Sequence, residues 1–183
     1  MTLGASGGTP DRGRPGRSSC SQLVGRSTSA SPAAVRLRAP APEDRPALGA
    51  LFESTAEFTV EEVRVALEML DAGDDPHVVA EEDGEIVGYA CFGPTPLTEG
   101  VWDLYWLVVE ASRRSRGIGR TLLERVERCA GAGGRMMLVE TSSLPAYAPS
   151  RAFYRRNGYE EIARFPDFYR VGDDKIVYRK LLR

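Results

Sequence analysis

The chain has 183 residues with a net charge of −2, and 42% of its residues are hydrophobic, which is enough for one domain with a sizeable core. Residues 1–38 hold six arginines and one aspartate, leaving +5, whereas the rest holds 18 basic and 25 acidic residues, leaving −7. An acidic body argues against nucleic-acid binding, which needs a broad basic face, and no apolar run is long enough to span a membrane.

The first segment, residues 1–33, is rich in Ser, Gly, Arg and Pro and holds few large apolar side chains. Such a segment cannot bury enough surface to order itself, so we expect a disordered tail followed by one folded domain over residues 34–183. The three cysteines, Cys20, Cys91 and Cys129, are widely spaced, and His77 is the only histidine. This composition predicts no metal site and favours a reducing, cytoplasmic location.

The first half of the domain alternates strands and helices. Residues 34–38 predict a strand, and residues 43–54 carry apolar side chains at helical spacing. Thr59 and Glu62 form a capping box that opens the next helix, and Gly73 ends it. Two further strands, 78–82 and 85–92, flank Asp83-Gly84, a strong hairpin signal.

A loop over residues 93–100 leads to a strand over residues 101–109. Strict alternation along this strand places one set of side chains on one face and the intervening set on the other. The first set is Asp103, Tyr105, Leu107 and Val109, and the second is Trp102, Leu104, Trp106 and Val108.

The turn after this strand reads Arg114-Ser115-Arg116-Gly117-Ile118-Gly119 and opens an amphipathic helix. Its glycines let main-chain amides approach a ligand closely, and amides at a helix N-terminus favour an anion. Arg114, Arg116 and Arg120 add positive charge, so the turn suits a pyrophosphate. It lacks the Gly-Lys-Ser/Thr and G-x-G-x-x-G patterns of the common nucleotide sites.

The remaining elements are a strand over 136–141, a helix from Pro149 that ends before Gly158, and closing strands over 159–164 and 175–181. The chain thus predicts one mixed α/β domain.

Arg114, Gly117 and Gly119 resemble the R/Q-x-x-G-x-G/A coenzyme A signature of the GNAT superfamily of N-acyltransferases, and Leu107-Val108-Val109-Glu110 is similar to the approach to that signature. The resemblance covers about residues 34–181 and implies a mixed, mostly antiparallel sheet, splayed between its fourth and fifth strands and flanked by helices. It also implies acetyl-CoA as co-substrate, with the pantetheine arm pairing with main chain in the splay. The implied cofactor-binding residues are Leu107, Val108, Val109, Arg114, Ser115, Arg116, Gly117, Ile118, Gly119, Arg120 and Thr121.

A second resemblance covers residues 151–159, which are similar to the A-x-x-F-Y-x-x-x-G-F/Y segment of the same family. It places Tyr154 on the general-acid tyrosine, whose phenol can donate a proton to the leaving thiolate. The alternative for Tyr154 is packing of a short helix. The family's N-x-x-A is replaced by Tyr147 and Ser150, so Tyr147 either takes over the cofactor contact or shapes the acceptor pocket.

For the base, Asp103 is the best-placed carboxylate, because some members of the family carry a glutamate at this position. Glu140, near the end of the neighbouring strand, is the second candidate, and many GNAT enzymes use no dedicated base. The alternative for Asp103 is a solvated strand end.

The resulting hypothesis is an N-acetyltransferase that moves acetyl from acetyl-CoA to a primary amine of a small molecule by direct attack in a ternary complex. The acidic body favours a cationic acceptor, and Glu53, Glu57 and Glu61 either attract it or form a solvated helix face. The alternatives are a protein or peptide N-terminal acetyltransferase and a non-catalytic CoA-binding sensor. The sequence leaves open whether the protein forms a homodimer.

Overall fold

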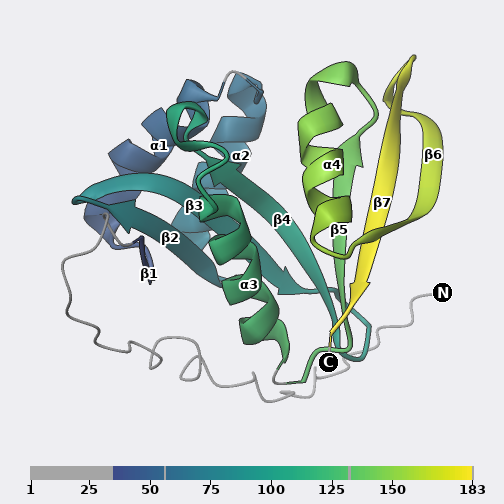
Figure 1. Ribbon diagram of the computed structural model, residues 1–183, viewed down its shortest axis with the longest axis horizontal. Coiled ribbons are helices and arrows are strands. Elements are labelled where there is room, and N and C mark those ends of the chain that lie inside the picture. The colour runs from purple at the N-terminus through teal and green to yellow at the C-terminus, as the bar shows by residue number, and fades with distance from the viewer. Residues whose placement is uncertain (1–34, 56, 132, 183) are drawn as a thin grey trace, which may run out of the picture.

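The computed structural model describes residues 35–55, 57–131 and 133–182, so the predicted tail over residues 1–33 lies outside the described residues. The described chain forms one seven-stranded sheet in the order β1-β2-β3-β4-β5-β7-β6 (Figure 1). Its strands are β1 (Arg36–Arg38), β2 (His77–Glu82), β3 (Glu85–Pro94), β4 (Val101–Val109), β5 (Met136–Ser142), β6 (Glu160–Arg170) and β7 (Asp173–Leu181). Among these strands β4 and β5 run parallel and the other neighbours are antiparallel, which confirms the predicted mixed sheet.

The sheet opens between β4 and β5. The two strands pair only from Val101–Leu104 against residues 136–139, although β4 continues to Val109 and β5 to Ser142. Beyond this pairing the ribbons of β4 and β5 diverge toward the end of the molecule where α3 and α4 begin (Figure 1). The predicted splay between the fourth and fifth strands is therefore confirmed.

Helices cover both faces of the sheet. On one face lie α1 (Arg45–Ser54) and α2 (Val60–Ala72), and on the other lie α3 (Ile118–Gly131) and α4 (Ala148–Arg156). Three short 3-10 helices, η1 (Pro42–Asp44), η2 (Ala111–Arg113) and η3 (Pro145–Tyr147), join these elements. The core under α1 and α2 includes Phe52 and Tyr89, and the core under α3 includes Leu122 and Val126, all nearly or fully excluded from solvent.

Local signals fix the ends of several elements as predicted. The Thr59 hydroxyl accepts from the Glu62 amide at 3.2 Å, and the Glu62 carboxylate accepts from the Thr59 amide at 2.7 Å, which completes the capping box of α2. Gly73 ends α2 in the left-handed conformation with φ 61°. Helix α4 ends in a Schellman motif, because the Tyr159 amide bonds the Tyr154 carbonyl at 3.1 Å and Gly158 takes φ 85°.

One predicted feature of β4 is wrong. Cys91 of β3 faces Trp106 and the next residue, Phe92, faces Leu104, so Tyr105 is an extra residue in a β-bulge. The bulge shifts the alternation by one position, because each inserted residue exchanges the two faces. Trp102 and Leu104 therefore pack on the α3 side together with Leu107 and Val109, whereas Trp106 and Val108 pack on the side of α1 and α2.

The last hairpin is longer than the sequence predicted. We expected β6 to end at Arg164, but it continues to Arg170 with register shifts, and β7 begins at Asp173. Pairing with β7 extends β6 through a segment that has few large buried side chains and thus little periodicity to read. Among the described residues, no helix combines the length and apolar character needed to cross a membrane.

Candidate active site

The turn between β4 and α3 has the backbone that a close anion approach requires. Gly117 takes φ 87° and Ser115 takes φ 65°, both in the left-handed region. A Cβ atom built on Gly117 would meet no atom within 4 Å, so one side of this residue is open. The turn therefore combines an accessible backbone with a conformation that favours glycine at position 117.

Helix α3 begins directly at this turn. The Thr121 amide donates to the Gly117 carbonyl at 3.0 Å, which is the first hydrogen bond of the helix. The amides of Ile118, Gly119 and Arg120 precede that bond and so belong to the first turn, whose N–H groups have no acceptor within the helix. Helix α3 is 14 residues long, so its N-terminus offers unpaired main-chain donors together with the positive end of the helix dipole.

The arginine side chains of the turn are paired with carboxylates. Arg114 Nη1 lies 2.7 Å from Glu57 Oε1, and Arg116 Nη1 lies 3.2 Å from Glu82 Oε2. Arg120 pairs along its own helix with a glutamate one turn later, at 2.8 Å. The sequence predicted the positive charges but not these partners. Because Arg114 and Arg116 are paired, an anion at the turn would compete with the carboxylates for them.

The splay exposes main-chain groups of β4. The Glu110 amide donates to the Val87 carbonyl of β3 at 3.0 Å, and the register pairs Val108 with Tyr89. Because bonding directions alternate along an antiparallel strand, Glu110 and Val108 point their main chain toward β3, and Leu107 and Val109 point theirs toward the splay. Val108 also buries its side chain on the side of α1 and α2, so of the three predicted residues only Leu107 and Val109 face the opening.

Three elements meet at Gly119. A Cβ atom built on Gly119 would lie 3.5 Å from the ring of Phe153 on α4 and 3.5 Å from Val109 at the end of β4. These are ordinary contact distances, so Gly119 lets α3, α4 and β4 approach closely. Phe153 acts here as a packing residue.

Tyr154 lies on α4 on the same side of the sheet as α3. Its ring contacts the rings of Phe153 and Tyr159 edge-on, with centroids 5.4 and 5.7 Å apart, and the residue is only 7% exposed. Burial raises the pKa of its phenol above the ordinary value, because the charged form loses solvation. The hydroxyl therefore keeps its proton at neutral pH, which the role of a proton donor requires. Packing also explains the ring, so the catalytic assignment stays a prediction.

The two candidate bases lie on the opposite side of the sheet. Asp103 pairs across the sheet with Gly93 and Leu138, and its carboxylate accepts from the Thr95 hydroxyl at 2.6 Å. We predicted that Asp103 shares a face of β4 with Leu107 and Val109. This prediction is wrong, because the bulge at Tyr105 lies between them and places Asp103 on the other face. Burial first, and then the charges of Asp75 and Asp103, raise the pKa of the neighbouring Tyr105 to about 12.

Glu140 follows Val139 on β5, and Val139 is buried on the α3 side of the sheet. Because side chains alternate along a strand, Glu140 lies on the opposite side, which is the side of Asp103. Its carboxylate accepts from Lys175 Nζ at 3.0 Å, and half of its side chain is exposed. In the described residues no group of three or more His, Cys, Asp or Glu side chains is arranged to hold a metal ion.

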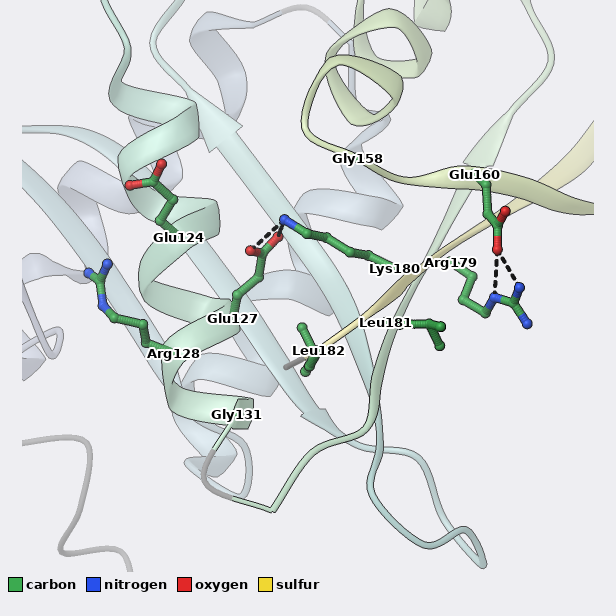
Figure 2. Close-up of a pocket in the computed structure, with 10 residues that line it drawn as sticks. All are labelled: Glu124, Glu127, Arg128, Gly131, Gly158, Glu160, Arg179, Lys180, Leu181 and Leu182. Atoms are coloured by element: carbon green, nitrogen blue, oxygen red, sulfur yellow. Dashed lines mark hydrogen bonds and ion pairs between the residues drawn. The ribbon is translucent and has the colours of Figure 1, made fainter.

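A cavity between the second half of α3 and the end of β7 lies away from these residues (Figure 2). Ion pairs lie on its walls: Lys180 Nζ bonds both carboxylate oxygens of Glu127 at 2.9 and 2.7 Å, and Arg179 bonds Glu160. The Tyr159 hydroxyl also donates to Glu127, at 3.0 Å. The bonds to Glu127 join α3, β7 and the segment between α4 and β6, and no predicted site residue lines the cavity.

One connection across the splay was not predicted from the sequence. The Tyr147 hydroxyl, on η3, donates to the main-chain carbonyl of Glu57 at 2.9 Å. Glu57 thus touches both Tyr147 and Arg114, which follow β5 and β4 respectively. The contact spans 90 positions in the chain, so no local pattern could have signalled it.

Comparison with known proteins agrees with this geometry. Residues 73–161 match the acetyltransferase (GNAT) domain family. The crystal structure of a GNAT-family protein from Desulfovibrio desulfuricans has 43% sequence identity and a TM-score of 0.79, over 82% of this chain and 100% of that one. The chain therefore belongs to the GNAT family of acetyltransferases.

More distant proteins are also similar to this chain. The uncharacterized N-acetyltransferase YhfO of Bacillus subtilis is 28% identical over 72% of this chain and 93% of its own length. An aminoglycoside 6′-N-acetyltransferase crystallised with coenzyme A has a TM-score of 0.68 at 20% identity, over 81% of this chain and 97% of that one. The match to the uncharacterized protein ML0378 of Mycobacterium leprae, at 32% identity, spans 57% of this chain and only 28% of that larger protein.

Proposed function

We propose that this protein transfers an acetyl group from acetyl-CoA to the primary amine of a small molecule, by direct attack of the amine in a ternary complex. The observation that carries the proposal is the half-open pairing of β4 and β5, which leaves the main chain of Leu107 and Val109 facing a splay that leads to the start of α3.

The residues at the turn fit coenzyme A. The open side of Gly117 leaves room for a diphosphate, and the amides of Ile118, Gly119 and Arg120 supply donors for it. Leu107 and Val109 supply main-chain partners for an extended arm. When bound, acetyl-CoA supplies the thioester whose acetyl group is transferred.

The positions of the titratable groups support this chemistry. Tyr154 lies on the α3 side of the sheet, whereas Asp103 and Glu140 lie on the side of α1 and α2. A thioester in the splay between β4 and β5 would lie between these two sets. Tyr154 holds a proton that a departing thiolate can accept, and the carboxylates on the other side can attract and deprotonate an ammonium, directly or through water.

The test is release of free thiol from acetyl-CoA across a panel of primary amines and of peptides with free N-termini. Turnover of a small amine with no turnover of peptides is the expected result. Preference for peptides would overturn the small-molecule assignment in favour of N-terminal acetylation. Binding of CoA without turnover on the whole panel would instead indicate a CoA-binding sensor.

A further inference from the structure

Glu57 connects the two strands that separate at the splay. Its carboxylate bonds Arg114, which belongs to the turn after β4, at 2.7 Å. Its main-chain carbonyl accepts from Tyr147, which belongs to η3 after β5, at 2.9 Å. Glu57 itself lies between α1 and α2 in the chain. The end of α1 and the start of α2 lie at the end of the molecule where α3 and α4 begin (Figure 1).

The Glu57–Arg114 ion pair is one that a ligand can exchange. The side chains are 22% and 40% exposed, and such partly exposed pairs contribute little free energy. A diphosphate carries more negative charge than one carboxylate, and guanidinium binds phosphate oxygens with two parallel hydrogen bonds. Arg114 therefore gains by leaving Glu57 when a diphosphate occupies the turn.

The carboxylate that Arg114 would leave lies in a negative environment. Tyr147 is half-buried, and its hydroxyl bonds the main-chain carbonyl of the same residue, Glu57. Burial, followed by the charges of Glu62, Glu57 and Asp173, raises the pKa of the Tyr147 phenol, and only the charge of Arg170 acts in the opposite direction. Without Arg114, a carboxylate at this position favours a cation. An ammonium is the cation that the proposed reaction brings to the mouth of the splay.

We propose, resting on the proposed function, that Glu57 couples the two substrates: it pairs with Arg114 in the empty enzyme and binds the ammonium of a cationic acceptor once coenzyme A has displaced it from Arg114. Glu57 is a positioning and specificity residue in this scheme, and no bond is made or broken at it. Coenzyme A then binds before the amine. Because coupling is reciprocal, each substrate tightens the binding of the other by the same factor.

The test compares the wild-type protein with Glu57→Gln, which keeps the size of the side chain and removes its charge. Glu68→Gln is the matched control, since Glu68 is an exposed glutamate of α2 that also pairs with an arginine, Arg64, but along its own helix. CoA binding is measured by titration calorimetry. We expect Glu57→Gln to bind CoA about two- to fivefold more tightly, because Arg114 has lost its competing partner, and Glu68→Gln to bind as the wild type does.

The second measurement is steady-state kinetics with the most active amine of the panel. We expect Glu57→Gln to raise the KM for that amine about fivefold or more with kcat unchanged, a split that a purely structural role would not produce. Unchanged or weaker CoA binding by Glu57→Gln overturns the exchange, and an unchanged amine KM overturns the acceptor contact. If the wild-type protein binds no CoA, the proposed function fails as well, so the two failures are distinguishable.

Discussion

Replacing Gly117 by aspartate tests the diphosphate site most directly. Gly117 precedes α3 with φ 87°, and its open side is where a diphosphate would approach the amides of the first helical turn. The substitution adds a methylene and a negative charge on that side. It leaves the core untouched, because a Cβ atom at this position meets nothing within 4 Å.

The substitution is expected to change both the stability of the protein and its affinity for CoA. A side chain in the left-handed region costs roughly 1–2 kcal/mol of stability, which lowers the melting temperature but does not unfold a domain of this size. Repulsion between the new carboxylate and a phosphate at about 4 Å is worth about 1 kcal/mol in water and about 4 kcal/mol at an effective dielectric constant of 20. The dissociation constant of CoA should therefore rise by about fivefold at the least and about 1,000-fold at the most.

The assay is calorimetric titration of CoA, with Gly73→Asp as the matched control. Gly73 also has a left-handed backbone, with φ 61°, and open space around its Cβ position, but it ends α2 far along the chain from the turn. Both variants should lose similar stability in thermal denaturation. Only Gly117→Asp should lose CoA affinity. A folded Gly117→Asp protein that binds CoA as tightly as Gly73→Asp would refute the assignment of the turn.

Three further predictions follow from the site and the fold. Tyr154→Phe keeps the ring packing and removes the proton donor, so kcat should fall about 10²-fold, and full activity in the folded variant would return Tyr154 to a packing role. Asp103→Asn and Glu140→Gln, measured in parallel, should identify the base: the variant that removes the base should lose kcat at neutral pH, where a carboxylate is ionised and the acceptor amine is still protonated, and two unaffected variants would mean that no dedicated base exists. Asp44→Asn should lower the free energy of unfolding by about 1–3 kcal/mol at pH 7, since buried Asp44 accepts from Arg38 at 3.0 Å. The Arg38 guanidinium lowers the pKa of Asp44 below 3.8, so this stabilisation is complete above that pH and is lost as pH falls through the folded pKa. Urea denaturation should thus show a smaller difference between wild type and Asp44→Asn at pH 3 than at pH 7, and an equal difference would contradict the pairing.

Many secondary-structure elements of this protein could be predicted from its sequence, because interactions between neighbouring residues define them. The capping box at Thr59, the glycine that ends α2 and the Asp83-Gly84 hairpin all depend on residues within a few positions of each other, and the structure has each of them. The glycine-containing turn before α3 was identified in the same way. Its resemblance to a family motif then implied a splayed sheet, which no local pattern encodes.

Contacts between segments that lie far apart in the chain could not be predicted from the sequence. The bulge at Tyr105 exchanged the faces of β4, and it arises from pairing with β3 rather than from any irregularity in the apolar pattern. The carboxylate partners of Arg114 and Arg116 come from Glu57 and Glu82, more than 30 positions away.

The sequence by itself determined the elements, the turn that suits an anion and the family, because helix caps, turns and periodicity are properties of neighbouring residues. Only the tertiary structure decided that Asp103 and Tyr154 lie on opposite sides of the sheet and that Glu57 joins both edges of the splay. Those placements depend on strand register and on loops that meet in space, and register is fixed by the packing of the whole sheet.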